Sequence, residues 1–218
     1  MTRGSLWEQI TEQLSMRYSE LAVAVVQHIQ LVALSMLIAI LLGVPLGILV
    51  SRVKFLQGPV LGLAGILQTI PSLALLGFMI PFFGIGVTTA VIALFLYSLL
   101  PIVRNTFTGI KDVDKAVVQA AKGMGMTNWQ ILAKVELPLS LSVIMAGIRT
   151  STVINVGTAT LAAFIGAGGL GDFIFLGISR SLDALVLIGA VPAAILALLI
   201  DYLLGRLELV VTPKGLKI

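Results

Sequence analysis

The sequence predicts an all-α integral membrane protein with about five transmembrane helices. Of its 218 residues, 58% are hydrophobic and only 11% are charged. Soluble domains carry about 25% charged residues, so this composition excludes a water-soluble globular domain and a disordered chain. One helical crossing needs ~20 apolar residues, which leaves room for about five or six spans.

The sequence has no cysteine and a single histidine, His28. It therefore predicts no disulfide, no thiolate metal site and no His-rich metal centre. An intramembrane enzyme would need a nucleophile and a base held together, and the predicted spans contain no paired carboxylates. We expect no catalytic residue, no metal and no cofactor in this chain.

Stretches without charged residues mark the expected spans. Residues 21–51 and 55–103 contain no Lys, Arg, Asp or Glu, whereas 137–171 carry one charge and 184–200 none. The second stretch would make about 70 Å of helix, far more than a ~30 Å hydrocarbon core. It must therefore turn, and the Pro and two Gly within residues 81–86 favour that place.

The first 20 residues mix charged and apolar side chains, which is typical of an amphipathic helix on a membrane surface. No cleavable signal is indicated, because no small-residue cleavage site follows a short apolar core. We therefore expect an interfacial segment (1–20), a transmembrane domain (21–211) and a tail (212–218). His28, at the entry of the first span, is expected at the membrane interface.

Basic residues indicate the orientation. Five spans place the termini on opposite sides, and the side richer in Lys and Arg is expected to be cytoplasmic. One side holds Arg52, Lys54, Arg104, Lys111, Lys115, Lys122, Lys134, Arg206, Lys214 and Lys217, and the other holds Arg3, Arg17 and Arg180. The N-terminus is therefore predicted outside, and the C-terminus and the loop at about 104–137 in the cytoplasm.

That loop is predicted to form a helical hairpin. Asp114 precedes a stretch ending at Lys122, which favours a helix with an acid at its N-terminus and a base at its C-terminus. Gly125 follows in a turn. Thr127 and Gln130 form a capping box that opens a second helix over 128–135, and Pro138 is placed to start the next span. A basic loop lying on lipid headgroups is the alternative.

The spacing within this loop resembles the coupling motif of ATP-binding cassette (ABC) importer permeases, Glu-Ala-Ala-x3-Gly-x9-Ile-x-Leu-Pro. Gln119 replaces the motif's Glu, which removes any ion pair that this Glu makes, and Val135 replaces Ile. The resemblance implies a type I ABC importer permease fold with a cytoplasmic coupling-helix hairpin. It assigns contact with the ATPase to Gln119, Ala120, Ala121, Gly125, Trp129, Leu137 and Pro138.

Further segments are similar to the osmoprotectant branch, whose permeases carry glycine betaine, choline or carnitine. These segments are residues 43–47, 68–72, 100–106, 146–152 and 211–215. The resemblance implies a bacterial or archaeal cytoplasmic membrane and no nucleic-acid partner. A permease for methionine or another small solute is the first alternative, and a stand-alone channel or carrier the second.

The resemblance also implies partners. Two ATPase subunits would bind ATP and Mg²⁺, because this chain contains no Gly-x4-Gly-Lys-Ser/Thr phosphate loop. A second permease subunit, identical or a close paralogue, would help to enclose the path. An extracytoplasmic binding protein, expected to be a separate chain, would deliver the substrate.

Polar residues inside spans are costly and mark candidate positions in the translocation path or at a dimer seam. Ser151, Asn155 and Thr158 recur at i, i+4 and i+7, on one helical face. A hydroxyl can also bond a carbonyl of its own helix, so a packing role stays open. The full candidate set is Gln68, Thr69, Ser72, Tyr97, Arg149, Ser151, Asn155 and Thr158.

Overall fold

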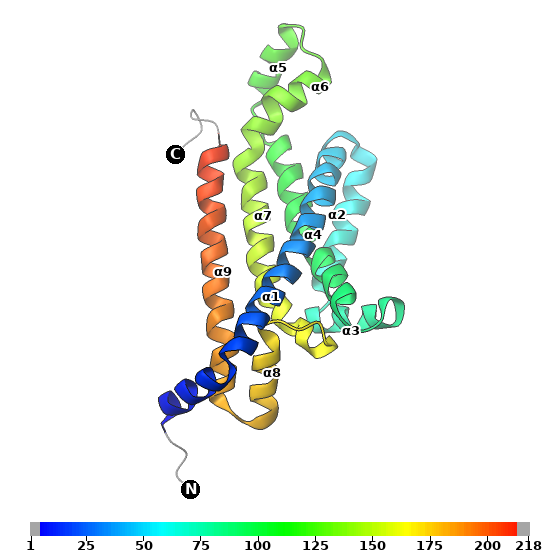
Figure 1. Ribbon diagram of the computed structural model, residues 1–218. Helices are drawn as coiled ribbons and strands as arrows, with labels where there is room; N and C mark the ends of the chain where they lie inside the picture. Colours follow the sequence, from blue (N-terminus) through cyan, green and yellow to red (C-terminus); the bar gives the residue numbers. More distant parts are fainter. Residues whose placement is uncertain (1–4, 213–218) are drawn as a thin grey trace.

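The computed structural model describes residues 5–212, and these residues form helices and short turns (Figure 1). Its elements are α1 (Leu6–Arg52), α2 (Lys54–Thr69), α3 (Ser72–Phe83), α4 (Val87–Lys111), α5 (Lys115–Gly123), α6 (Asn128–Ile131), a π-helical turn (Leu132–Glu136), α7 (Leu137–Ala159), a 3-10 turn (Thr160–Ile165), α8 (Gly171–Arg180) and α9 (Asp183–Val211). The predicted all-α class is confirmed.

Four helical segments are long and apolar enough to cross a membrane: Leu6–Arg52, Val87–Lys111, Asn128–Ile165 and Asp183–Val211. The consecutive helices α2 and α3 pass the same test together but are bent by 105°. Counting this bent pair as one span gives five, in agreement with the sequence.

Helix α1 runs through the described part of the predicted interfacial segment and through the first candidate span. A capping box starts it, in which the Glu8 backbone N–H donates to Ser5 Oγ at 3.3 Å and the Ser5 N–H to Glu8 Oε2 at 2.9 Å. The helix kinks at Arg17, where φ is −125° and ψ is 18°. This kink lies three residues before the predicted end of the interfacial segment at residue 20, and that boundary stays a prediction.

The chain between α1 and α4 turns twice. The predicted turn is present at Gly84 and Gly86, both of which have positive φ. A second break, at Ile70 and Pro71, separates α2 from α3, so residues 55–80 do not form one straight span. Pro71 lacks a backbone N–H and cannot continue the hydrogen-bond ladder of α2.

The core lies where α4 packs between α1 and α7. Leu94 and Ile102 of α4 are fully buried there. Glycine allows the close approach of α4 to α1, because a Cβ on Gly47 would lie 2.6 Å from the Thr106 Cβ. Small residues are the usual means of bringing membrane helices together.

His28 is wrongly predicted as interfacial: its side chain is 0% exposed. Its Nε2 lies 3.1 Å from the carbonyl oxygen of Val156 on α7. The turn at Gly166–Gly169 covers it, since a Cβ on Gly169 would lie 3.2 Å from His28 Nδ1. The sequence indicated that His28 begins a span but not that a distant turn folds over it.

The hairpin of α5 and α6 extends beyond the bundle at the end where α9 finishes (Figure 1). The start of α1 and the short helix α8 lie at the opposite end (Figure 1). This arrangement places the predicted cytoplasmic loop and the end of the last span on one side of the molecule.

Candidate functional site

Local capping interactions build the hairpin. Asp114 Oδ1 accepts from the Ala116 N–H at 2.8 Å and begins α5. Gly125 has φ +81° and turns the chain. At the start of α6, the Gln130 N–H donates to Thr127 Oγ1 at 3.3 Å, and the Thr127 N–H donates to Gln130 Oε1 at 2.8 Å. The predicted capping box is confirmed.

The second helix of the hairpin continues into α7. Residues Leu132–Glu136 form a π-helical turn instead of the last part of a separate helix over 128–135. Pro138 lies in the first turn of α7. A proline nitrogen has no hydrogen to donate to the carbonyl four residues earlier, and a π turn accommodates such a gap.

An ion pair joins the base of the hairpin to the end of α1. Arg52 Nη1 donates to Glu136 Oε1 at 3.3 Å, and Nη2 pairs with Oε2. Glu136 is buried, with 6% of its surface exposed. A buried carboxylate requires a partner, so this pair fixes the hairpin relative to α1.

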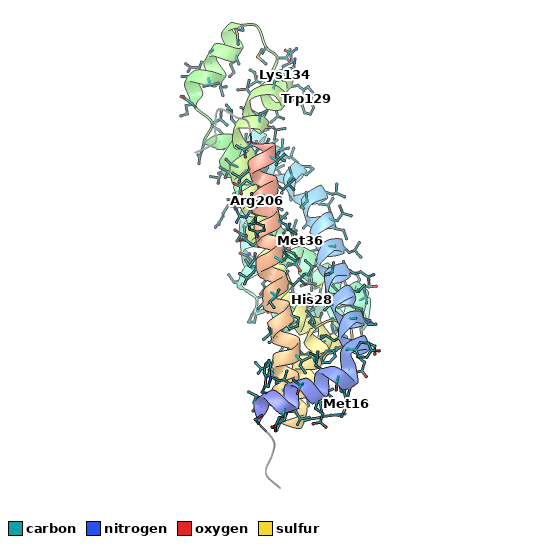
Figure 2. All side chains as sticks on the ribbon, turned by 60° about the vertical axis from the view of Figure 1, so that its left-hand side comes forward. Met16, His28, Met36, Trp129, Lys134 and Arg206 are labelled. Atoms are coloured by element: carbon teal, nitrogen blue, oxygen red, sulfur yellow. The ribbon has the colours of Figure 1, made fainter. Side chains whose placement is uncertain are left out.

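The exposed tip of the hairpin is apolar. Met124 is 75% exposed and Trp129 73% exposed, and Trp129 lies at the end of the molecule opposite Met16 (Figure 2). Ala120 is also exposed. Ala121 was expected on this surface, but it is only 2% exposed and packs inside the hairpin.

Two of the polar residues predicted in the path or seam lie inside the subunit. Ser151 and Asn155 are 1% and 2% exposed. Asn155 Nδ2 donates to Ser35 Oγ of α1 at 3.0 Å and to Ser98 Oγ of α4 at 2.8 Å. Ser151 Oγ donates to the Ser98 carbonyl at 2.8 Å. The prediction is wrong for these two because their polar face meets α1 and α4.

The other candidates remain on or near the surface. Thr158 is partly exposed and bonds the Ile154 carbonyl of its own helix at 2.9 Å. Thr69 is exposed and bonds the Ile66 carbonyl of its own helix at 2.7 Å, and Ser72 is half-buried in the first turn of α3.

Tyr97 and Gln68 support the break between α2 and α3. The Tyr97 hydroxyl donates to the Ile70 carbonyl, and Gln68 Nε2 donates to the Tyr97 carbonyl at 3.5 Å. A freed backbone carbonyl inside a membrane needs such a donor. Both side chains therefore have a structural role at the bend.

Arg149 binds two acidic residues that sequence reasoning did not assign to it. Its guanidinium reaches Asp201 at 3.0 Å and Glu208 at 2.9 Å, both on α9. Two signals could have identified them. An arginine inside a span requires a counter-charge, and residues seven apart lie on the same face of a helix.

A multi-pass helical protein with five candidate spans, buried hydrogen bonds that join α1, α4 and α7, and a projecting hairpin has the architecture of a transporter's membrane subunit. Residues 39–212 match the family described as "Binding-protein-dependent transport system inner membrane component". The chain belongs to this family.

Three relatives have names that give a substrate class. The chain is 51% identical over 191 residues to the carnitine transport permease protein OpuCB of Listeria monocytogenes, covering 88% of each chain. It is 46% identical over 208 residues to the choline transport system permease protein OpuBB of Bacillus subtilis (strain 168), covering 95% of this chain and 96% of the relative. It is 52% identical over 196 residues to the osmoprotectant import permease protein OsmW of Salmonella typhimurium, covering 88% and 91%.

Solved structures share the fold. The inward-facing MetNI methionine ABC transporter matches with a TM-score of 0.80 at 25% identity, over 88% of this chain and 97% of that one. An amino acid ABC transporter with histidines matches with a TM-score of 0.75 at 21% identity, over 89% and 96%. The expected type I ABC importer permease fold is confirmed.

The chain is thus a non-catalytic, multi-pass permease subunit of an ABC importer. Membership of a binding-protein-dependent family implies two kinds of partner, an ATPase and a substrate-binding protein.

Proposed function

We propose that this permease carries a small quaternary-ammonium osmoprotectant such as glycine betaine, choline or carnitine. The observation that supports this substrate class is the set of relatives 43–52% identical over most of the chain, whose names give carnitine, choline, glycine betaine or an osmoprotectant. Methionine is the alternative, because the MetNI transporter shares the fold, but at 25% identity.

The hairpin at 112–138 is proposed to transmit ATPase motion to the spans. Met124 and Trp129 form its apolar tip, and more than 70% of the surface of each residue is exposed. No described part of the chain covers this tip. A contiguous exposed apolar patch indicates contact with a protein or a membrane, and the projection of the hairpin beyond the bundle favours a protein (Figure 1). The Arg52–Glu136 pair gives the hairpin a fixed connection to α1 through which motion can pass.

The working complex is proposed to contain two permease subunits, two ATPase subunits and a separate extracytoplasmic binding protein. ATP and Mg²⁺ would bind in the ATPase. The permease lies in a bacterial or archaeal cytoplasmic membrane with its N-terminus outside. We assign residues 1–20 to the interface, 21–211 to the transmembrane domain and 212–218 to the cytoplasm. Residues 1–4 and 213–218 of this assignment lie outside the described part of the chain. The hairpin and the end of α9 at one end of the fold support this sidedness (Figure 1).

Substrate transport is tested in proteoliposomes that contain the permease, its ATPase and its binding protein. ATP-driven uptake of labelled glycine betaine, choline, carnitine and methionine is compared, with a non-hydrolysable ATP analogue as the control. The proposal expects uptake of at least one quaternary amine and none of methionine. Methionine uptake alone, or uptake without ATP, would contradict it.

Coupling is tested with the chain's two tryptophans, which are almost equally exposed: Trp129 at 73% and Trp7 at 72%. Trp129→Ala should reduce copurification of the ATPase about tenfold, the scale of a moderate interface hot spot. Trp7→Ala, at the opposite end of the chain's fold, should leave it unchanged. Equal copurification of both variants with the ATPase would overturn the coupling role.

A further inference from the structure

A groove lies on the surface of the bundle between α1 and the start of α4. Its volume is about 640 Å³, which is within the range of about 300–1,000 Å³ found for small-molecule sites. Both helices are candidate spans, so whatever occupies the groove comes from the membrane or from a neighbouring subunit. The lining residues on which the argument depends are Gln27, Gln30, Leu34, Leu37, Val91 and Ala167.

The groove is polar at one end and apolar over the rest of its length. Gln27, Gln30, Leu34 and Leu37 recur at i, i+3, i+7 and i+10, so they follow one face of α1. Leu34 and Leu37 are 48% and 55% exposed and form an apolar wall. None of the described residues that line the groove is charged.

The two amides at the polar end have N–H groups free to donate. Gln27 Oε1 accepts from the Gly169 N–H at 3.2 Å, which leaves the NH₂ group of Gln27 without an acceptor among the described residues. The Gln30 side chain is exposed and makes no hydrogen bond to another described residue. A polar group at membrane depth is costly without a partner. This end of the groove therefore favours a ligand that carries acceptor oxygens.

The length of the groove corresponds to one leaflet of a bilayer. Ten residues separate Gln27 from Leu37, which is about 15 Å along the helix and about half of a ~30 Å hydrocarbon core. Leu37 lies close to the middle of the uncharged stretch 21–51, so the amides are placed near the boundary of the leaflet. His28 and Met36, labelled in Figure 2, mark the levels of the two ends of this stretch of α1.

We propose that the groove binds one phospholipid, with an acyl chain along Leu34 and Leu37 and glycerol ester oxygens that accept from the Gln27 and Gln30 amides. A phospholipid has its parts in this order, with acceptor oxygens at the boundary of the leaflet and an apolar chain that reaches the midplane. In the orientation proposed above, the lipid belongs to the outer leaflet. A helix of a second subunit fits less well, because seams between membrane helices need small residues and leucines form this wall.

A photoreactive lipid tests whether the groove is occupied. The probe is a phosphatidylcholine with a diazirine in one acyl chain, present in both leaflets of vesicles that contain the permease–ATPase complex. After irradiation, mass spectrometry should find Leu34 and Leu37 labelled severalfold more than Leu41 and Leu42. These four leucines of α1 are 48%, 55%, 62% and 54% exposed, so lipid that merely surrounds the protein would label them evenly. Even labelling would overturn the inference.

Two tryptophan variants test whether the groove itself retains the lipid. Leu37→Trp places a larger side chain in the groove, and Leu42→Trp is the matched control, since the two leucines are 55% and 54% exposed. Native mass spectrometry should find one bound lipid fewer per permease in Leu37→Trp than in Leu42→Trp, and labelling of Leu34 should fall severalfold in Leu37→Trp alone. Equal lipid counts and equal labelling in the two variants would show that the groove binds no lipid.

The polar end is tested separately. Gln30→Leu removes a donor to the ester oxygens and should lower the labelling of Leu34 and Leu37 severalfold. A phosphatidylglycerol probe should label as well as the phosphatidylcholine probe, because the described lining carries no charge that could select a headgroup. Labelling that is unchanged in Gln30→Leu, or that depends on an anionic headgroup, would contradict the proposed amide contact.

A cysteine variant identifies a protein occupant. The sequence has no cysteine, so Leu34→Cys gives the permease a single thiol. Under oxidation, the permease of this variant should stay monomeric on a non-reducing gel. Disulfide-linked permease dimers would show that a second copy covers the groove in place of a lipid. That result would leave the proposed substrate and the proposed coupling role standing, because neither depends on this groove.

Discussion

The Arg149 guanidinium donates three hydrogen bonds to the two oxygens of the Asp201 carboxylate. Nε donates to Oδ1 at 3.1 Å, and Nη2 lies 3.0 Å from Oδ1 and 3.1 Å from Oδ2. Nη1 donates to Glu208 Oε2 at 2.9 Å. Gly205 lies between the two acids, and a Cβ there would come within 3.3 Å of the guanidinium carbon. Arg149 of α7 thus binds two acidic residues on the same face of α9.

Removing this arginine should loosen α7 from α9. Arg149→Ala leaves two carboxylates on one face without a counter-charge, and we expect a loss of about 1–3 kcal/mol, between the values for exposed and buried pairs. The Tm of the detergent-solubilised complex measures the loss. Arg206→Ala is the control, since Arg206 donates only to Tyr202 of its own helix among the described contacts. An equal Tm for both variants would refute the role of the Arg149 cluster.

Asn155→Leu should have a mild effect on stability and none on substrate affinity. The Ser35 and Ser98 hydroxyls keep their own backbone acceptors, Val32 and Leu94. Interhelical hydrogen bonds in membranes contribute about 0.6 kcal/mol on average, so we expect a loss of about 1 kcal/mol in unfolding free energy. A changed KM for substrate uptake in the Asn155→Leu variant would contradict this prediction and would indicate that Asn155 contacts the substrate in the translocation path.

The features that the sequence predicted correctly are those set by local chemistry. Apolar stretches define the spans because a membrane requires them. The Thr127–Gln130 capping box and the Gly125 turn depend on residues three to four positions apart. Such patterns can be recognised without knowledge of the fold.

The errors arose where distant segments meet. The polar face of α7 is visible in the sequence, but its direction depends on where α1 and α4 pack, which placed Asn155 inside the subunit. His28 was misjudged for the same reason, since residues near 156 and 169 bury it. Helical periodicity identifies a face and not the neighbour of that face.

Tyr97→Phe should weaken the bend between α2 and α3. The variant keeps the ring and removes the hydroxyl that donates to the Ile70 carbonyl. A buried carbonyl left without a donor costs about 1–3 kcal/mol. Leu63 on α2 and Phe78 on α3 are exposed and lie on opposite sides of the bend. The distance between spin labels at these two positions should have a broader distribution in the variant. Tyr18→Phe, at a 71% exposed tyrosine, should leave it unchanged, and a similar distribution in both would refute the role of the hydroxyl.

Gly125 allows the sharpest test of the hairpin, because its requirement is conformational and not steric. Its φ is +81°, yet a Cβ built on it would have no heavy atom within 4 Å apart from those of Gly125 and its two neighbours in the chain. A β-branched residue resists this φ, and strain of this kind costs about 1–3 kcal/mol.

Gly125→Val should therefore distort the turn between α5 and α6 and reduce both ATPase copurification and substrate-stimulated ATP hydrolysis. Gly123→Val is the matched control, since Gly123 has equally open surroundings and does not have a positive φ. Gly125→Asn should retain most of the wild-type coupling, because Asn tolerates left-handed backbone better than other side chains. If Gly125→Val couples as well as Gly123→Val, the shape of this turn does not control the ATPase contact.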